Sequence, residues 1–181
     1  MNAFAEFVYH VAITPGRRRT VFAVIGAVVW YGGVALAIVF SPTIDRWLGI
    51  GFSIPTAVRL PVGIALMVVG TPAVVWTIAR FLRVRGTPIP FNPPPQLVTN
   101  GMYGVIRNPM LTGWTLLLIG VGILLQSFVF LAVFMPAFLL LHIVYLKLVE
   151  EKEMEKKFGQ AYTDYRRRVP MFIPGLKGTR R

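Results

Sequence analysis

Apolar residues fall in long uninterrupted runs along the chain, and these runs have the length of helices that cross a membrane. A helix rises about 1.5 Å per residue, so a hydrocarbon core of about 30 Å takes roughly 20 apolar residues. Two runs without a charged residue satisfy this requirement: Val21–Phe40, which ends at Ser41-Pro42, and Leu60–Ala79. They predict the first two transmembrane helices.

A third run, Leu111–Leu146, is also free of charged residues but is too long for a single span. The polar pair Gln126-Ser127 divides it into Leu111–Leu125 and Phe128–Leu146, and Pro136 predicts a kink in the second arm. The chain is therefore predicted to be an all-α, polytopic membrane helix bundle. We expect about four transmembrane helices, a C-terminal helical hairpin and a cytoplasmic tail helix.

Composition and charge support this reading and add an orientation. The 181 residues are 55% hydrophobic and yet carry a formal net charge of +12, a combination that soluble domains rarely show. Of the 19 lysines and arginines, all but Arg46 and Arg59 fall on one side of the predicted membrane. The positive-inside rule makes that side cytoplasmic, with both termini there. Short basic clusters beside apolar runs favour membrane orientation over nucleic-acid binding.

The inventory of reactive side chains excludes several chemistries. The chain has no cysteine, so disulfides and thiolate catalysis are excluded, and its two histidines, His10 and His142, are too far apart to predict a metal site. His142 falls inside the last apolar run. A histidine there is either a structural hydrogen-bonding residue that faces the bundle or part of a functional site.

The loop between the second and third spans is not an ordinary connector. Five prolines within Pro88–Pro95 predict a stiff, extended segment, which is either a wall of a site or a rigid spacer. Arg107-Asn108-Pro109 then directly precedes the third span. The helix N-terminus and the Arg107 cation can together receive a carboxylate. Alternatively, Asn108 only caps the helix and Arg107 contacts lipid headgroups.

Acidic residues are concentrated in the tail, where five of the seven lie between Glu150 and Asp164. Most of them, Glu153 included, are typical of a solvated helix face with i,i+4 pairs. Glu150 and Glu151 differ because they follow the last span at the membrane interface. A carboxylate there is costly unless it is paired or bound to a ligand. Lys147 is the expected partner of Glu150 if no ligand is bound.

Aromatic residues follow the acidic segment at helical spacing. Phe158, Tyr162 and Tyr165 precede the basic run Arg166–Arg168. They are typical either of an interfacial aromatic belt or of a pocket for an adenine ring or a sulfonium cation.

Taken together, these motifs resemble the isoprenylcysteine carboxyl methyltransferase family and the related membrane phospholipid methyltransferases. The resemblance covers roughly Gly86 to Pro174 and rests on the order of short motifs with a hairpin-length gap between them. The motifs are Leu97-Val98-Thr99, Gly101, Tyr103, Arg107-Asn108-Pro109, Glu150-Glu151, Phe158-Gly159, Tyr162, Tyr165, Val169-Pro170 and Pro174.

The resemblance implies a cytoplasmic pocket for S-adenosylmethionine, formed by residues 86–181, whereas residues 1–85 contribute the N-terminal segment and first two spans. The cofactor-binding residues it implies are Gln96, Leu97, Val98, Tyr103, Asn108, Pro109, Met110 and Leu111, with Glu150, Glu151, Tyr162 and Tyr165. We predict Glu150, Arg107 and Lys147 as the catalytic set. The expected partners are membrane lipids and a lipophilic or lipidated acceptor. We expect no nucleic acid, and the oligomeric state is not predicted.

Three positions depart from the family pattern and bear on the acceptor. Asn108 stands where many members have histidine, and Leu111 stands where tyrosine is usual. Leu146 stands where the eukaryotic carboxyl methyltransferases have an arginine on the substrate side, so a prenylcysteine carboxylate is not indicated. The acceptor is expected to be a lipidic or small hydrophobic carboxylate or amine.

Methyl transfer from a sulfonium requires mainly alignment of donor and acceptor, which fits a chain without a Ser/His/Asp constellation. The alternatives are an NADPH-dependent membrane reductase of related architecture and a non-catalytic lipid-binding membrane protein.

Overall fold

The computed structural model of the protein describes residues 17–83 and 96–174. The predicted proline-rich segment Pro88–Pro95 and the boundary between residues 85 and 86 lie outside the described residues. Within these ranges every regular element is helical, which confirms the all-α prediction. The helices in chain order are α2 (Arg17–Leu48), α3 (Thr56–Arg83), η1 (Gly101–Gly104), α4 (Pro109–Leu125), η2 (Phe130–Phe134), α5 (Met135–Tyr145), η3 (Leu146–Glu150), α6 (Glu151–Phe158) and α7 (Gln160–Arg168).

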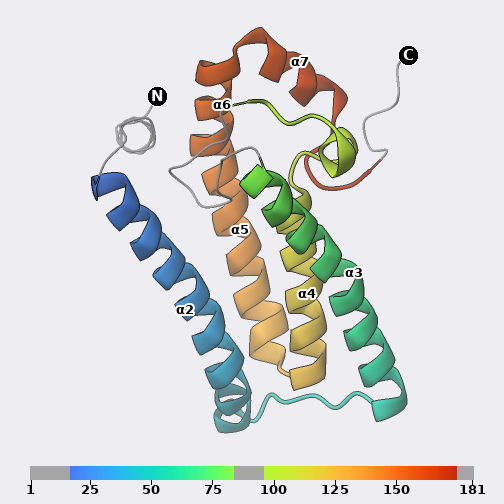
Figure 1. Ribbon diagram of the computed structural model, residues 1–181. Coiled ribbons are helices and arrows are strands. Elements are labelled where there is room, and N and C mark those ends of the chain that lie inside the picture. Colours follow the sequence, from blue (N-terminus) through green and yellow to red (C-terminus); the bar gives the residue numbers. More distant parts are fainter. Residues whose placement is uncertain (1–16, 84–95, 175–181) are drawn as a thin grey trace.

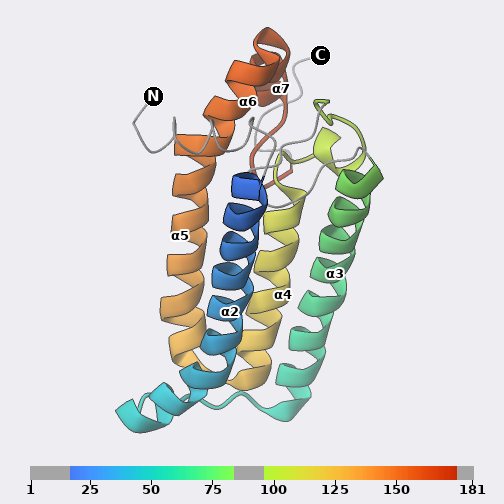
Figure 2. The same cartoon turned by 60° about the vertical axis from the view of Figure 1, so that its left-hand side comes forward.

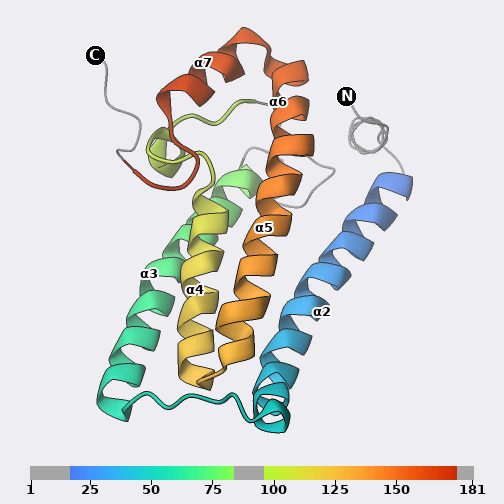
Figure 3. The ribbon, with the colours of Figure 1, turned by 180° about the vertical axis from the view of Figure 1, so that it is seen from behind.

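The long helices run alternately up and down, and the segments from η2 to α6 form one continuous helix (Figure 1). The helices α6 and α7 project at the end of the bundle where α2 begins (Figures 1 and 2). Seen from behind, α2 diverges from α5 toward that same end (Figure 3). The bundle is therefore more open at the end where the tail helices lie.

Three helical stretches are long and apolar enough to cross a membrane: Val24–Leu48, Thr56–Arg83 and Phe130–Phe158. Their outward faces remain apolar, with Val29 69% exposed and Leu141 68% exposed, as expected for side chains that contact lipid. The fourth, α4, has 17 residues and is about 26 Å long at 1.5 Å per residue, slightly shorter than the hydrocarbon core. The chain is an integral membrane protein, and the count of four spans stays a prediction.

The predicted end of the first span at Ser41-Pro42 is wrong, because α2 continues through Pro42 to Leu48. Proline removes one backbone donor and bends a helix without necessarily ending it. Figure 2 shows this bend in the last turns of α2. The extension brings Asp45 to the far end of the bundle, where its side chain is 3% exposed.

Asp45 joins α2 to the turn that divides the last two spans. The amide N–H of Val129 donates to Asp45 Oδ1 at 2.8 Å, and that of Phe130 donates to Ser127 Oγ at 3.1 Å. Two side chains thus cap the free donors at the start of the last long helix. Gln126 adopts a φ of 52°, so the predicted break of the hairpin at Gln126-Ser127 is confirmed.

Paired glycines bring α3 and α4 into close contact. A Cβ on Gly70 would lie 2.5 Å from the carbonyl oxygen of Gly113, and a Cβ on Gly120 would lie 2.6 Å from that of Gly63. Small residues at facing positions let two helices approach within backbone contact distance, a common packing mode in membranes. This contact positions α4, whose N-terminus carries the Arg107-Asn108-Pro109 motif.

Candidate active site

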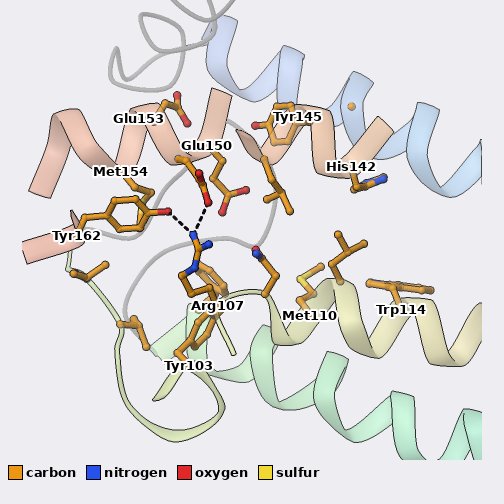
Figure 4. A pocket seen from close by; sticks show the side chains of 18 of the residues that line it. Tyr103, Arg107, Met110, Trp114, His142, Tyr145, Glu150, Glu153, Met154 and Tyr162 are labelled. Carbon is orange, nitrogen blue, oxygen red and sulfur yellow. Dashed lines mark hydrogen bonds and ion pairs between the residues drawn. The ribbon is translucent and has the colours of Figure 1, made fainter. Parts of the chain in front are cut away.

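A cavity of about 420 Å³ lies between the ends of α2, α4 and α5 and below the tail helices, a volume usual for small-molecule sites. Figure 4 shows its lining side chains converging from the last long helix, from α4 and from the loop before α4. The lining residues are Gly26, Ala27, Trp30, Tyr31, Phe81, Leu97, Val98, Tyr103, Arg107, Asn108, Met110, Leu111, Trp114, His142, Tyr145, Leu146, Glu150, Glu151, Glu153, Met154, Tyr162 and Tyr165.

A π-helical turn shapes one wall of the cavity. The segment η3 (Leu146–Glu150) has i→i+5 hydrogen bonds, and its first and last residues both line the cavity. One extra residue per turn rotates the following helix, so that Glu153 and Met154 also face this space. Such turns are frequent at functional sites because they interrupt the regular helix face.

Arg107 is held by the chain itself on several sides. Its guanidinium forms an ion pair with Glu151, its Nε donates to the carbonyl oxygen of Val169 at 3.1 Å, and Tyr162 Oη lies 3.5 Å from Nη1. The side chains of Arg107 and Glu151 are only 9% and 15% exposed. The carboxylate expected to dock beside Arg107 is therefore supplied by Glu151 (Figure 4).

The tail folds back over the cavity from a turn at Gly159, which has a φ of 55°. This turn, favoured by glycine, separates α6 from α7 and brings the buried rings of Tyr162 and Tyr165 over the loop before α4. Tyr165 Oη donates to the carbonyl oxygen of Tyr103 at 2.7 Å. The cavity roof is thus tied to both the loop and α4.

Burial raises the pKa of two tyrosine hydroxyls at the cavity. Burial, with a smaller contribution from the Glu151 carboxylate, raises the pKa of Tyr162 to about 12, although Arg107 opposes this shift. Burial and the Glu150 carboxylate also raise the pKa of Tyr103. Both hydroxyls are protonated at neutral pH, as they would be at the ordinary tyrosine pKa, and the raised pKa keeps them so well into the alkaline range.

The family model for phospholipid methyltransferases matches residues 58–161, from the first turn of α3 into α7. This match spans more than half of the chain and includes most of the cavity wall. The protein belongs to the phospholipid methyltransferase family. The α2 residues that line the cavity lie outside the matched region.

Two relatives add to this assignment. Over 101 residues the chain is 31% identical to methanethiol S-methyltransferase 2 of Bradyrhizobium diazoefficiens, covering 56% of this chain and 36% of the relative. Over 85 residues it is 34% identical to protein-S-isoprenylcysteine O-methyltransferase of Tribolium castaneum, covering 45% of this chain and 29% of the relative. The aligned regions thus span about a third of the length of these relatives.

The structure brings together most residues that the family resemblance implies. Those that line the cavity are Leu97, Val98, Tyr103, Arg107, Asn108, Met110, Leu111, Glu150, Glu151, Tyr162 and Tyr165. Asn108 makes no side-chain cap to α4, so the capping interpretation is wrong for its side chain, which faces the cavity. Whether these residues bind the cofactor or act in catalysis stays a prediction.

Three of the predicted site residues do not line the cavity. Gln96 is exposed, and Pro109 is fully buried in the first turn of α4. Lys147 is also exposed, and the structure records no ion pair between Lys147 and Glu150 among the described residues. Lys147 projects from the helix on a face that does not line the cavity, so its predicted pairing with Glu150 is wrong.

Sequence reasoning missed other parts of the wall. Glu153 was expected on a solvated face but is only 7% exposed and lines the cavity. The positions of His142, Leu146 and Glu150 follow helical spacing, so a face analysis of the last helix can find them, whereas Glu153 lies beyond the π-helical turn that shifts this spacing. The stretch of α2 from Gly26 to Tyr31 shows no pattern of one distinct helix face, because the sequence around it is uniformly apolar.

Proposed function

We propose that this protein transfers a methyl group from S-adenosylmethionine to a lipophilic acceptor. The observation that carries this proposal is the convergence of two separate motif segments on one cavity. Residues from Leu97 to Leu111 and from Glu150 to Tyr165 are more than 30 residues apart in sequence, roughly the length of a helical hairpin, and they line the same space. A family of methyltransferases and two relatives with methyltransferase names support the same reaction class.

The lining residues fit the chemistry of this cofactor. S-adenosylmethionine carries a sulfonium and an ammonium cation, and Glu150 and Glu153 bring carboxylates to the cavity. Tyr103, Tyr162 and Tyr165 offer aromatic faces to an adenine ring or a sulfonium, and the hydroxyls of Tyr103 and Tyr162 add hydrogen-bonding groups. When bound, the cofactor supplies an already activated methyl group.

The role of the protein is then alignment and exclusion of water. Tyr162 and Tyr165 on α7 cover the cavity, and the Arg107–Glu151 ion pair holds the α4 end of the wall to α6. Restraining both reactants in one geometry can lower the barrier by about 7–11 kcal/mol in favourable cases. Such catalysis needs few chemically active side chains.

We further propose that both termini and the cavity mouth lie on the cytoplasmic side. The bias of lysine and arginine supports this orientation, since among the described residues only Arg46 and Arg59 fall at the opposite end of the bundle. The polar cofactor would then enter from the cytoplasm, whereas a lipophilic acceptor would reach the cavity from the bilayer. Membrane lipids would surround the apolar outer faces.

The experiment is a binding measurement on the purified full chain in lipid nanodiscs. Titration with S-adenosylmethionine should give saturable binding to the wild type and at least tenfold weaker binding to Glu150→Ala. Lys147→Ala, whose side chain is exposed and does not line the cavity, is the matched control and should bind like the wild type. No binding by the wild type would overturn the cofactor assignment, and preferential displacement by NADPH would favour a reductase instead.

A second measurement tests turnover. Incubation of the wild type with methyl-labelled cofactor and total membrane lipid should transfer label to a lipid-soluble product. Label that stays entirely on the cofactor, despite saturable cofactor binding, would favour a non-catalytic lipid-binding protein.

A further inference from the structure

The helix α2 supplies one wall of the cavity, and this wall has an open position and a filled one. Gly26 and Trp30 both line the cavity and lie four residues apart, so they share one face of the helix. A Cβ built on Gly26 would meet no atom of the described residues within 4 Å. The ring centroid of Trp30, by contrast, lies 4.3 Å from that of His142 and 6.3 Å from that of Trp114. The wall is therefore open at Gly26 and closed at Trp30.

Trp30 ends the cavity because the packed core begins directly behind its ring. The centroid of Trp30 lies 4.6 Å from that of Phe138, which is 5% exposed and does not line the cavity. Phe138 stacks on His142 with centroids 4.5 Å apart, and His142 Nδ1 lies 2.7 Å from the carbonyl oxygen of Phe138. These contacts hold the three rings together. A ligand cannot extend past Trp30 without displacing a residue of the core.

The two ends of the cavity differ in charge. Arg107, Glu150 and Glu153 line it near the tail, whereas the described lining residues of α2 are uncharged. His142 precedes Glu150 by eight residues, about 12 Å along a helix, and Figure 4 places it at the end away from Tyr162. A charged group without a partner is costly in an apolar environment. The cofactor, with its charged groups, is therefore favoured near the tail, and an apolar group is favoured at Trp30.

The size of the cavity limits this apolar group. Cavities of about 300–1,000 Å³ hold one drug-sized ligand, and the cavity here has about 420 Å³. S-adenosylmethionine is itself a ligand of that size. With the cofactor near the tail, little more than a short chain fits between Gly26 and Trp30.

We propose that the space between Gly26 and Trp30 holds the apolar part of the methyl acceptor, and that Trp30 is the specificity-determining residue that limits its length. The family model matches residues 58–161, so this limit is set by a helix outside the shared region. The inference rests on the proposed methyl transfer. It names a steric property of the acceptor and leaves the nucleophilic atom open.

The first test compares acceptors that differ only in chain length, on the full-length wild type in nanodiscs. Butyl and octyl members of three series, the amines, the thiols and the carboxylic acids, are each supplied with methyl-labelled S-adenosylmethionine. We expect at least one butyl compound to be methylated and its octyl homologue to react at least about tenfold more slowly, since a single methylene can change discrimination by roughly 10–200-fold. An octyl compound that reacts as fast as its butyl homologue would overturn the length limit.

The second test assigns the limit to Trp30. In Trp30→Ala the ratio of the octyl rate to the butyl rate should rise at least about tenfold over the wild-type ratio. Partition of the compounds into lipid cancels in this comparison, because both proteins are measured in the same nanodiscs. Val29→Ala, adjacent on α2 and 69% exposed, is the matched control and should keep the wild-type ratio. An unchanged ratio in Trp30→Ala would remove Trp30 from this role.

The third test fills the open position. Leucine at position 26 meets no described atom at its Cβ and favours a helix more than glycine does, so Gly26→Leu should fold. It should bind S-adenosylmethionine within about twofold of the wild type and methylate the butyl compound at least about tenfold more slowly. Gly33→Leu, which is exposed on α2 and does not line the cavity, is the control and should match the wild type in both. Loss of cofactor binding in Gly26→Leu alone would assign this space to the cofactor and overturn the acceptor subsite.

The outcomes distinguish this inference from the underlying proposal. If the wild type does not bind S-adenosylmethionine, the proposed function itself fails. If it binds the cofactor and methylates membrane lipid but none of the butyl compounds, the short subsite is wrong while the proposed function stands. Should Trp30→Ala not bind the cofactor, Trp30→Leu replaces it, and the octyl-to-butyl ratio should rise at least about threefold because leucine fills less of the space. No rise in Trp30→Leu would then overturn the inference.

Discussion

The ion pair between Arg107 and Glu151 connects the start of α4 to the helix that carries the tail, so its removal should loosen the cavity roof. Arg107→Met deletes the charge and keeps most of the aliphatic length. Because the two side chains are only 9% and 15% exposed, Glu151 would be left largely desolvated without its closest partner. The Arg107 bond to the carbonyl of Val169 would also be lost.

The expected magnitude follows from this burial. Removing one partner of a buried pair costs about 3–5 kcal/mol. Arg166 moderates this cost, since its Nη1 remains 3.5 Å from Glu151 Oε2. We therefore expect Arg107→Met to lower the free energy of unfolding by about 2–3 kcal/mol, which corresponds to a fall in Tm of roughly 4–12 °C for a chain of this size. Cofactor affinity should fall as well.

A double-mutant cycle with Glu151→Gln, followed by thermal unfolding in detergent, isolates the pair. The double variant should be less destabilised than the sum of the single variants, with a coupling energy of at least about 1.5 kcal/mol. Arg168→Met, at an exposed position on α7, should change the free energy of unfolding by less than about 0.5 kcal/mol. A coupling energy below about 0.5 kcal/mol would show that this ion pair does not hold the roof.

Three further predictions address packing, capping and pH. Gly70→Ala would force α3 and α4 apart and should lower the free energy of unfolding by about 1–3 kcal/mol. A Cβ on Gly33 meets open space, so the control Gly33→Ala should be neutral or stabilising. Equal Tm values for the two variants would contradict the packing argument. Asp45→Ala removes the cap of the last long helix and should lower the free energy of unfolding by about 1–2 kcal/mol. Thermal unfolding measures this change, and an unchanged Tm would argue against the cap. The pKa of Tyr162 is 10.0 in the unfolded chain and rises to about 12 in the folded chain. The protonated hydroxyl's contribution to the free energy of unfolding is therefore complete below pH 10 and is lost as the pH rises through 12. The decline of Tm between these pH values should be smaller in Tyr162→Phe, and an identical decline would contradict this assignment.

The long apolar runs alone determined the fold class and the positions of the main helices. Backbone groups in a bilayer must be satisfied within the helix, so an uncharged run of sufficient length has few other structures available. The same reasoning placed the hairpin break at Gln126-Ser127, because a polar pair in an apolar run is least costly at the membrane surface. The order of the motifs around the hairpin also pointed to the correct family. This order can be seen in the sequence alone, without knowledge of how the motifs lie in space.

Only the tertiary structure decided which further residues, beyond those that the family resemblance implies, share the cavity. Glu153 and Lys147 are close in sequence and both polar, yet the turn at η3 directs one into the cavity and leaves the other exposed. In the sequence, Arg107 is a cation without an evident partner. In the structure Arg107 pairs with Glu151, and the tail folds back at Gly159 so that α7 lies over this pair. Such contacts depend on helix rotation and on chain reversal, and local sequence patterns encode neither strongly. The wall from α2 is the clearest case: Trp30 lies in a uniformly apolar stretch, and only the packing of α2 against the bundle places its ring beside His142.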